Sequence, residues 1–348
     1  MTLRATLGEG NTPLIASAYI GPLLGLSGLF FKLEICNPSG SYKDRFIAGE
    51  VSAMLGLGVR ACIATSSGNT GSSLACYCAR YEIPCTIVVN EQTPSAKLLQ
   101  MQAHGARILR VTGFGVSPAV TENVLSLLSE FTGQFQAHLV VSAYRYCPAG
   151  MAGVETIAEE IRGQCRSVIN HVFVPTGGGG LFAAVCRGFL RTSGSKPHVH
   201  AIQPRGCSPV VSAFELGADR VLPTQSTTQI SGLSVPFDID GTLALRHLRE
   251  LGGQGFAVSD EEIWDAQSLL WEREGIYCEP AGAAALAGLR RAVHLGAILP
   301  NDTVICLVTG HGFKDPDSAH RAATRHVPIL IHENQLKDSL LKAVSPCG

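Results

Sequence analysis

The chain has 348 residues, of which 46% are hydrophobic and 16% are charged, and its formal net charge is -1. A chain of this length and composition can bury a large core, and we expect two domains. Because it has no run of lysine and arginine, it lacks the basic surface that nucleic acids and anionic membranes bind, so we expect a small-molecule ligand.

The amino-terminal residues and the cysteines further narrow the class of protein. No apolar leader precedes Glu9 and no apolar run reaches bilayer length, so we expect a cytoplasmic protein with no membrane partner. The twelve cysteines are mostly scattered singly through apolar segments, as reduced thiols are in intracellular proteins. The close pair Cys76 and Cys78 lies in a helical pattern without a second pair, so we expect no metal site.

From Leu29 onward, short apolar strands alternate with helices of ten or more residues. Strands are expected at 29–33, 61–65, 86–89, 107–111, 172–175, 199–203 and 303–309. Helices are expected at 42–55, 69–80, 95–104, 118–131, 150–161, 181–190, 260–273 and 281–294. This alternation predicts an α/β fold of parallel sheets covered by helices, in which residues 225–241 are long enough to form a functional loop.

Residues 37–45 place one lysine, Lys43, at the start of a helix behind a turn-forming run. The positive end of the helix dipole favours a neutral amine, so Lys43 can serve as a nucleophile. For an isolated lysine, a solvated ion pair with Asp44 or Glu50 is the simpler interpretation. The nucleophile is favoured only if other loops supply a site for a cofactor.

A polar loop follows the strand expected at 61–65. Its hydroxyl groups on Ser66, Ser67 and Thr70, its Asn69 amide and the N–H groups of the following helix form a pocket for a carboxylate. Helix capping explains one or two of these residues but not the whole run.

Four consecutive glycines, Gly177, Gly178, Gly179 and Gly180, separate the strand at 172–175 from the next helix. They leave backbone N–H groups unobstructed at a helix start, which suits a phosphate group. The spacing also matches a dinucleotide fingerprint, but the following strand ends at Gln203, where such a site needs an acidic residue. We therefore expect a phosphate monoester.

The strand expected at 303–309 ends at Thr309, and a loop through His311 follows it. Thr309 at the strand tip can present its hydroxyl inward, and the glycines beside His311 allow close backbone approach to a ligand. His311 by itself is more typical of a surface histidine than of a catalyst.

An amine nucleophile, a monophosphate cradle and a carboxylate pocket together suit pyridoxal 5'-phosphate acting on an amino acid. The chain resembles the fold type II pyridoxal-phosphate enzymes, whose architecture is that of the tryptophan synthase beta chain, and within them it is most similar to the threonine synthases. The matching segments run in family order over nearly the whole chain: residues 7–14, 37–45, 66–71, 177–180, 279–285 and 309–316.

The resemblance implies a role for each of the residues that would contact the cofactor. Lys43 would hold it as a Schiff base and act as general base and acid, and Asn69 would donate to its phenolic oxygen. The four glycines would hold the phosphate. Thr309 would face the pyridine nitrogen, where a hydroxyl cannot act as an aspartate counterion does, which suits elimination and replacement rather than transamination.

The resemblance also implies that Ser66, Ser67 and Thr70 bind the substrate carboxylate. The chain departs from the threonine synthase pattern at Glu155, which would take the place of a cation near the substrate phosphate. Either this carboxylate faces inward and repels a phosphorylated substrate, or it is a solvated helix residue. Arg145 and Lys97 remain as donors to a substrate phosphate.

From the same resemblance we expect a large cofactor domain of residues 1–45 and 146–348. Residues 46–145 would form a small mobile domain that closes over the substrate. We also expect a homodimer.

Three functions are open at this point. The first is a threonine synthase-like lyase that eliminates phosphate from O-phosphohomoserine and adds water to give threonine. The second is a beta-replacement synthase using O-phosphoserine or a similar activated serine, or a serine/threonine dehydratase. The third is a carrier of the cofactor or of another phosphate ligand without turnover, which the combination of Lys43, the carboxylate loop and Thr309 disfavours.

Overall fold

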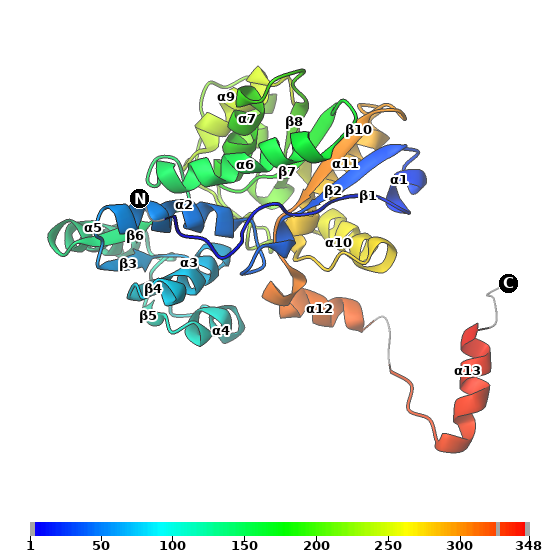
Figure 1. The fold of residues 1–348 in the computed structure, drawn as a ribbon, viewed down its shortest axis with the longest axis horizontal. Helices are drawn as coiled ribbons and strands as arrows, with labels where there is room; N and C mark the ends of the chain where they lie inside the picture. Colours follow the sequence, from blue (N-terminus) through cyan, green and yellow to red (C-terminus); the bar gives the residue numbers. More distant parts are fainter. Residues whose placement is uncertain (1–3, 325–327, 345–348) are drawn as a thin grey trace.

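The computed structural model describes residues 4–324 and 328–344, which fold around two β-sheets (Figure 1). The larger sheet has strand order β1-β2-β10-β7-β8-β9 and the smaller one β5-β4-β3-β6. All pairs in these sheets are parallel except β1 with β2. The strands are β1 (Leu14–Ala16), β2 (Gly28–Leu33), β3 (Ala61–Ala64), β4 (Cys85–Asn90), β5 (Arg107–Val111), β6 (Ala137–Val140), β7 (His171–Pro175), β8 (His198–Pro204), β9 (Gly255–Val258) and β10 (Thr303–Val308).

Helices connect the parallel strands, as crossover connections require. They are α1 (Ile20–Leu23), α2 (Lys43–Gly56), α3 (Asn69–Arg80), α4 (Ser95–Ala103), α5 (Pro118–Gln134), α6 (Pro148–Gln164), α7 (Gly180–Arg191), α8 (Pro209–Glu215), α9 (Gly241–Glu250), α10 (Asp260–Glu274), α11 (Pro280–His294), α12 (Pro316–Ala323) and α13 (Leu336–Val344). In Figure 1, α2 lies between the two groups of strands, and α13 lies apart from both.

The expected α/β class and all the expected strands and helices are confirmed, with strand ends within one residue and helix ends within three. Three strands were missed, namely β1, β6 and β9. Each has only three or four residues, which is too short for a period-two pattern to be distinguished from a loop. Four helices of ten residues or fewer, α1, α8, α9 and α12, were also missed.

The central strand β10 has apolar residues on both faces, as parallel strands covered on both sides do. Ile305 and Leu307 belong to the core cluster that contains residues of α6 and α7. Val304, Cys306 and Val308 belong to the cluster that contains residues of α10 and α11. Alternating residues of one strand therefore bury against opposite helical layers.

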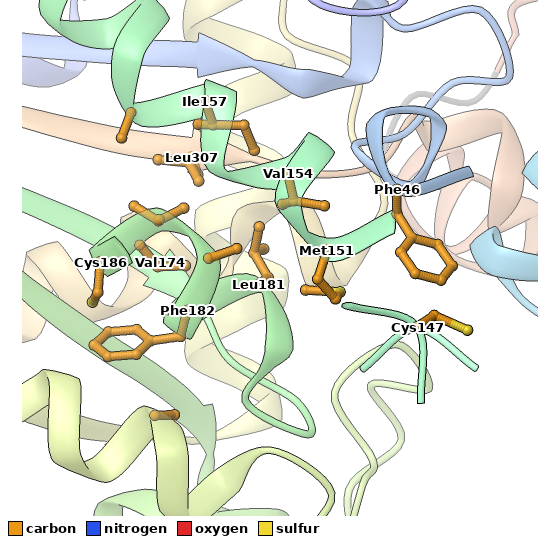
Figure 2. Close-up of a cluster of buried hydrophobic side chains, with 14 of the residues drawn as sticks. Phe46, Cys147, Met151, Val154, Ile157, Val174, Leu181, Phe182, Cys186 and Leu307 are labelled. Carbon is orange, nitrogen blue, oxygen red and sulfur yellow. The ribbon is translucent and has the colours of Figure 1, made fainter. Parts of the chain in front are cut away.

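The core on the α6 side is shared by the two sheets. Figure 2 shows Phe46 of α2 at the end of a row that includes Met151, Val154 and Ile157 of α6. The same cluster contains Cys62 of β3 in the smaller sheet and residues of β7 in the larger one. Helices α2 and α6 thus join the sheets through one continuous apolar core.

Glycines allow α2 and α6 to pack closely. A Cβ on Gly153 would lie 2.3 Å from the backbone carbonyl oxygen of Arg45, and one on Gly150 would lie 2.6 Å from the ring of Phe46. No side chain fits at such distances without displacement of a helix. This contact fixes the first turn of α2, where Lys43 lies.

The smaller sheet is built from strands between Ala61 and Val140, inside the segment expected to form the small domain. The proposed domain division and its closure over a substrate stay predictions.

Candidate active site

A cavity of about 1040 Å³ opens where strands of both sheets end. Its walls come from the start of α2, the loops after β3, β7 and β10, and residues 231–239. Ligand sites of open parallel sheets lie at such carboxyl ends. The cavity therefore joins segments that are far apart in the sequence.

Lys43 is the first residue of α2 and lines this cavity. Its Nζ atom donates a hydrogen bond of 2.7 Å to Oγ of Ser142, which follows β6, and lies 4.8 Å from the centre of the Tyr42 ring. The sequence analysis gave no role to Ser142. A short hydroxyl partner for the amine was not foreseen.

The four glycines line the cavity at the start of α7. Gly179 has a φ of 96°, which favours glycine, and a Cβ there would lie 2.5 Å from the carbonyl oxygen of Asp240. The Asp240 N–H donates to the carbonyl of Gly178 at 2.9 Å. The long loop expected to be functional, residues 225–241, is thus packed directly on the glycine turn.

The polar loop after β3 faces the same cavity through Ser66, Ser67, Asn69 and Thr70. The chain is tightly folded here, because a Cβ on Gly71 would lie 2.2 Å from the carbonyl oxygen of Ser66. Helix α3 begins at Asn69, so its first N–H groups belong to this loop. Hydroxyls and amide donors are therefore gathered without a positive side chain.

The sequence analysis gave no role to Glu279, which forms part of the cavity wall. Its Oε1 atom accepts a hydrogen bond of 2.7 Å from Nδ2 of Asn69. Burial raises the pKa of Glu279, although Lys314 and the Asn69 hydrogen bond act in the opposite direction. Asn69 retains a second N–H for a ligand, because an amide nitrogen has two hydrogens.

Lys314 lies in the same wall and was also missed as a site residue. Its Nζ atom donates to Oε1 of Gln100 at 2.8 Å. Burial lowers the pKa of Lys314, while the charges of Glu279 and Asp44 raise it. Both Glu279 and Lys314 fall inside motifs quoted from the sequence, but motif membership gives no direction for a side chain.

Thr309 is buried at the end of β10 and lines the cavity. Its carbonyl accepts from the backbone N–H of Tyr42 at 3.1 Å. This bond ties the end of the central strand to the residue before Lys43. Thr309 and Lys43 are therefore held on the same side of the cavity by the backbone itself.

The two expected phosphate donors are placed differently. Lys97 on α4 lines the cavity. Arg145 is exposed, its guanidinium lies 5.6 Å from the centre of the Tyr146 ring, and it is not among the described lining residues. The structure thus brings together every expected site residue except Arg145.

Both readings of Glu155 are wrong. Its side chain is buried on α6, where it accepts from Oη of Tyr144 at 2.7 Å and from Nε of Arg187 at 3.0 Å. It also accepts from Nη1 of Arg191. Glu155 therefore neither faces the cavity nor lies in solvent, because α7 supplies two arginines that pair with it.

The comparisons with known proteins agree with this geometry. Residues 5–310 match the family model described as pyridoxal-phosphate dependent enzyme. The chain belongs to this family. It is 34% identical over 340 residues to the threonine synthase of Methanocaldococcus jannaschii, covering 95% of this chain and 82% of that protein. It is 32% identical to the threonine synthase of Mycobacterium tuberculosis, covering 94% of this chain and 88% of that protein.

Solved structures show the fold of this pyridoxal-phosphate enzyme. The processed form of threonine deaminase isoform 2 from Solanum lycopersicum aligns with a TM-score of 0.76 at 22% identity, over 90% of this chain and 83% of that one. Maize serine racemase aligns with a TM-score of 0.73 at 23% identity, over 96% of this chain and 93% of that one. Among the described residues, none of the helices is both long and apolar enough to cross a bilayer.

The residues present fit pyridoxal phosphate. The glycine turn exposes backbone N–H groups at the start of α7, and a side chain at Gly179 would collide with the backbone of Asp240. Lys43 offers an amine in the same cavity, and Thr309 a hydroxyl at the central strand. When bound, the cofactor supplies an aldehyde for the lysine and a ring that accepts electrons from the substrate.

Proposed function

We propose that this enzyme is a threonine synthase-like lyase, which converts O-phosphohomoserine and water to threonine and phosphate. The observation that carries the proposal is that the cavity holds Lys97 in addition to Lys43 and a carboxylate loop. An amino acid with a phosphate group needs anion-binding groups at both ends, and Lys97 supplies the second. The similarity to curated threonine synthases supports the same substrate.

Each residue has a task in this proposal. Ser66, Ser67 and Thr70 bind the substrate carboxylate with the first N–H groups of α3. The amine of Lys43 takes a proton from the α-carbon and returns protons later in the reaction. Ser142, 2.7 Å from the amine, orients it and receives its hydrogen bond.

Lys97 would donate to the substrate phosphate and stabilise its charge as the bond to the γ-carbon breaks. Glu279 holds Asn69 in place, and the second amide N–H of Asn69 would donate to the cofactor's phenolic oxygen. The family resemblance further supports a homodimer. Size-exclusion chromatography with light scattering tests that part of the proposal.

A second function is favoured by the position of Arg145, because its exposure removes one expected phosphate donor from the cavity. A serine/threonine dehydratase, whose substrates carry no phosphate group, needs no cation for one. The test is to incubate the holoenzyme separately with O-phosphohomoserine, O-phosphoserine, serine and threonine, and to follow phosphate, keto acid and threonine. Threonine formed with equimolar phosphate from O-phosphohomoserine supports the first function. No product from O-phosphohomoserine, with keto acid formed from serine or threonine, rejects it in favour of the dehydratase.

A further inference from the structure

Three cysteines meet on one face of the smaller sheet, away from the cavity-lining residues. Cys62 of β3 and Cys85 of β4 are register partners in adjacent parallel strands, so their side chains point to the same face. Cys78 of α3 covers that face. The three Sγ atoms all lie within 4.8 Å of one another, and those of Cys62 and Cys78 are 3.1 Å apart.

The three thiols lie in an apolar environment, but one of them can be reached by solvent. Cys62 and Cys78 are fully buried, whereas Cys85 is only partly buried. Three thiols gathered at one point, one of them only partly buried, offer a set of soft sulfur ligands to a cation.

The neighbouring polar side chains, His138 and Glu50, already have hydrogen-bond partners. His138 of β6 is the register partner of Cys62 on its other side, and its Nε2 atom lies 2.6 Å from Oε1 of Glu50. Oε2 of Glu50 accepts from the backbone N–H of Gly150 at 2.9 Å. Cys147 completes a second potential ligand set with these two residues, but the carboxylate of Glu50 is already bonded to His138 and to the Gly150 N–H.

We propose that Cys62, Cys78 and Cys85 form a binding site for a thiophilic d¹⁰ metal ion, represented by Zn²⁺. Sulfur atoms bound to one tetrahedral zinc are about 3.8 Å apart, given Zn–S bonds of about 2.3 Å, so small side-chain rotations suffice. Each thiol loses a proton and forms a Zn–S bond, with no change in oxidation state. A fourth position stays open beside Cys85, where water can enter.

The position of the site assigns it a structural role. Cys62 lies three residues before the polar loop that begins at Thr65, and Cys78 lies in the last turns of the helix that follows this loop. An ion held by both would fasten α3 to β3 and β4 and so fix the base of the loop. Sequence spacing gave no sign of this site, because the thiols converge only through strand pairing and helix packing.

Zinc binding to the reduced holoenzyme tests the proposal. After treatment with a chelator, the protein is equilibrated with chelator-buffered Zn²⁺, and bound metal is measured by elemental analysis. We expect one zinc per chain, a rise in Tm on loading, and about ten-fold or greater loss of affinity in Cys85→Ser and Cys78→Ala. Cys186→Ala and Cys306→Ala, which remove buried thiols elsewhere, serve as matched controls and should bind as wild type does.

A second measurement on the unmodified protein keeps the proposal testable if a buried variant fails to fold. Cd²⁺ in place of Zn²⁺ should give thiolate-to-metal charge-transfer absorption, and either ion should protect Cys85 from alkylation. Wild-type protein that retains less than a tenth of a zinc per chain and leaves Cys85 reactive overturns the proposal. Equal zinc in wild type and Cys85→Ser also overturns it.

Discussion

In the proposed site, two distant segments of the chain hold the cofactor, one through Lys43 and the other through the glycine turn. Lys43 belongs to α2 and contributes the amine, whereas the glycines precede α7 and contribute backbone donors. Lys43→Ala should therefore lower turnover roughly 10³-fold or more, while phosphate-dependent affinity for the cofactor is largely kept. Steady-state kinetics and equilibrium dialysis with pyridoxal phosphate measure the two effects. An equal loss of affinity and turnover would contradict this division.

Lys97 and Arg145 provide a matched pair of cations, one lining the cavity and one exposed. Loss of a charge-assisted hydrogen bond costs about 1.5–3 kcal/mol, so Lys97→Ala should lower kcat/KM for O-phosphohomoserine by about 10- to 100-fold, mainly through KM. Lys97→Arg should recover part of the loss. Arg145→Ala should change kcat/KM less than about two-fold. The reverse order of effects would show that the exposed arginine binds the phosphate.

At this scale the sequence predicts which loops form the site better than which side chains face it. The turn chemistry of the glycines and the hydroxyl-rich loop can be read directly, because backbone donors follow from residue type. The burial of Glu155 and the bond from Lys43 to Ser142 depend on packing between distant elements. A linear pattern carries no information about such packing.

At the scale of elements, the close packing of α2 on α6 positions Lys43. Gly153→Ala would place a Cβ 2.3 Å from the Arg45 carbonyl and force the helices apart, at a cost of about 1–3 kcal/mol. We expect a lower urea midpoint and a lower kcat, because Arg45 lies two residues after Lys43. Gly163→Ala, also on α6 but with open space around it, should be neutral or stabilising by up to about 1 kcal/mol. Equal effects of the two variants would show that the close contact between α2 and α6 affects neither stability nor kcat.

Ion pairs reinforce the same helix pair. Glu160 of α6 accepts from Nη1 of Arg45 at 2.6 Å and from Nζ of Lys32 at 2.7 Å. Burial alone would raise the pKa of Glu160, but Arg45 and Lys32 lower it to about 2. Because the folded pKa lies below the unfolded one, this stability is present above about pH 4.5 and is lost as pH falls toward 2.

The contribution of Glu160 is at most about 3 kcal/mol. Glu160→Gln should therefore be less stable than wild type at pH 7, with a difference that narrows as pH falls below 4.5. Urea unfolding between pH 7 and pH 3 measures this difference in the free energy of unfolding. Glu159→Gln, on the exposed side of the same helix, should follow the wild-type curve. A pH-independent difference for Glu160→Gln would contradict the ion-pair account.

Long elements were predictable from the sequence because their apolar period repeats several times. Helices such as α3 and strands such as β5 have their expected bounds. The missed strand β6 has only four residues, yet it lies beside β3 and leads into the segment containing Ser142. Pairing with a neighbour, rather than local propensity, makes such a short segment a strand.

At the scale of the whole molecule, function depends on two sheets sharing one cavity and one core. The polar loop belongs to the smaller sheet, whereas the glycine turn and Thr309 belong to the larger one. Their convergence could be expected from the rule that ligands lie at the carboxyl ends of parallel strands, together with the order of motifs typical of the family. Two other features could not be expected from the sequence, namely the shared core around α2 and α6 and the thiol cluster beneath α3. Both arise only from the folded arrangement.

The central claim is that the cofactor's aldehyde is joined to Lys43 and to no other lysine of the cavity. Hydride reduction of the pyridoxal-phosphate-loaded enzyme, followed by digestion and mass spectrometry, tests it most directly. We expect the cofactor-derived mass on the peptide that contains Lys43. Its absence there, or its presence on Lys97 or Lys314 instead, would contradict the account.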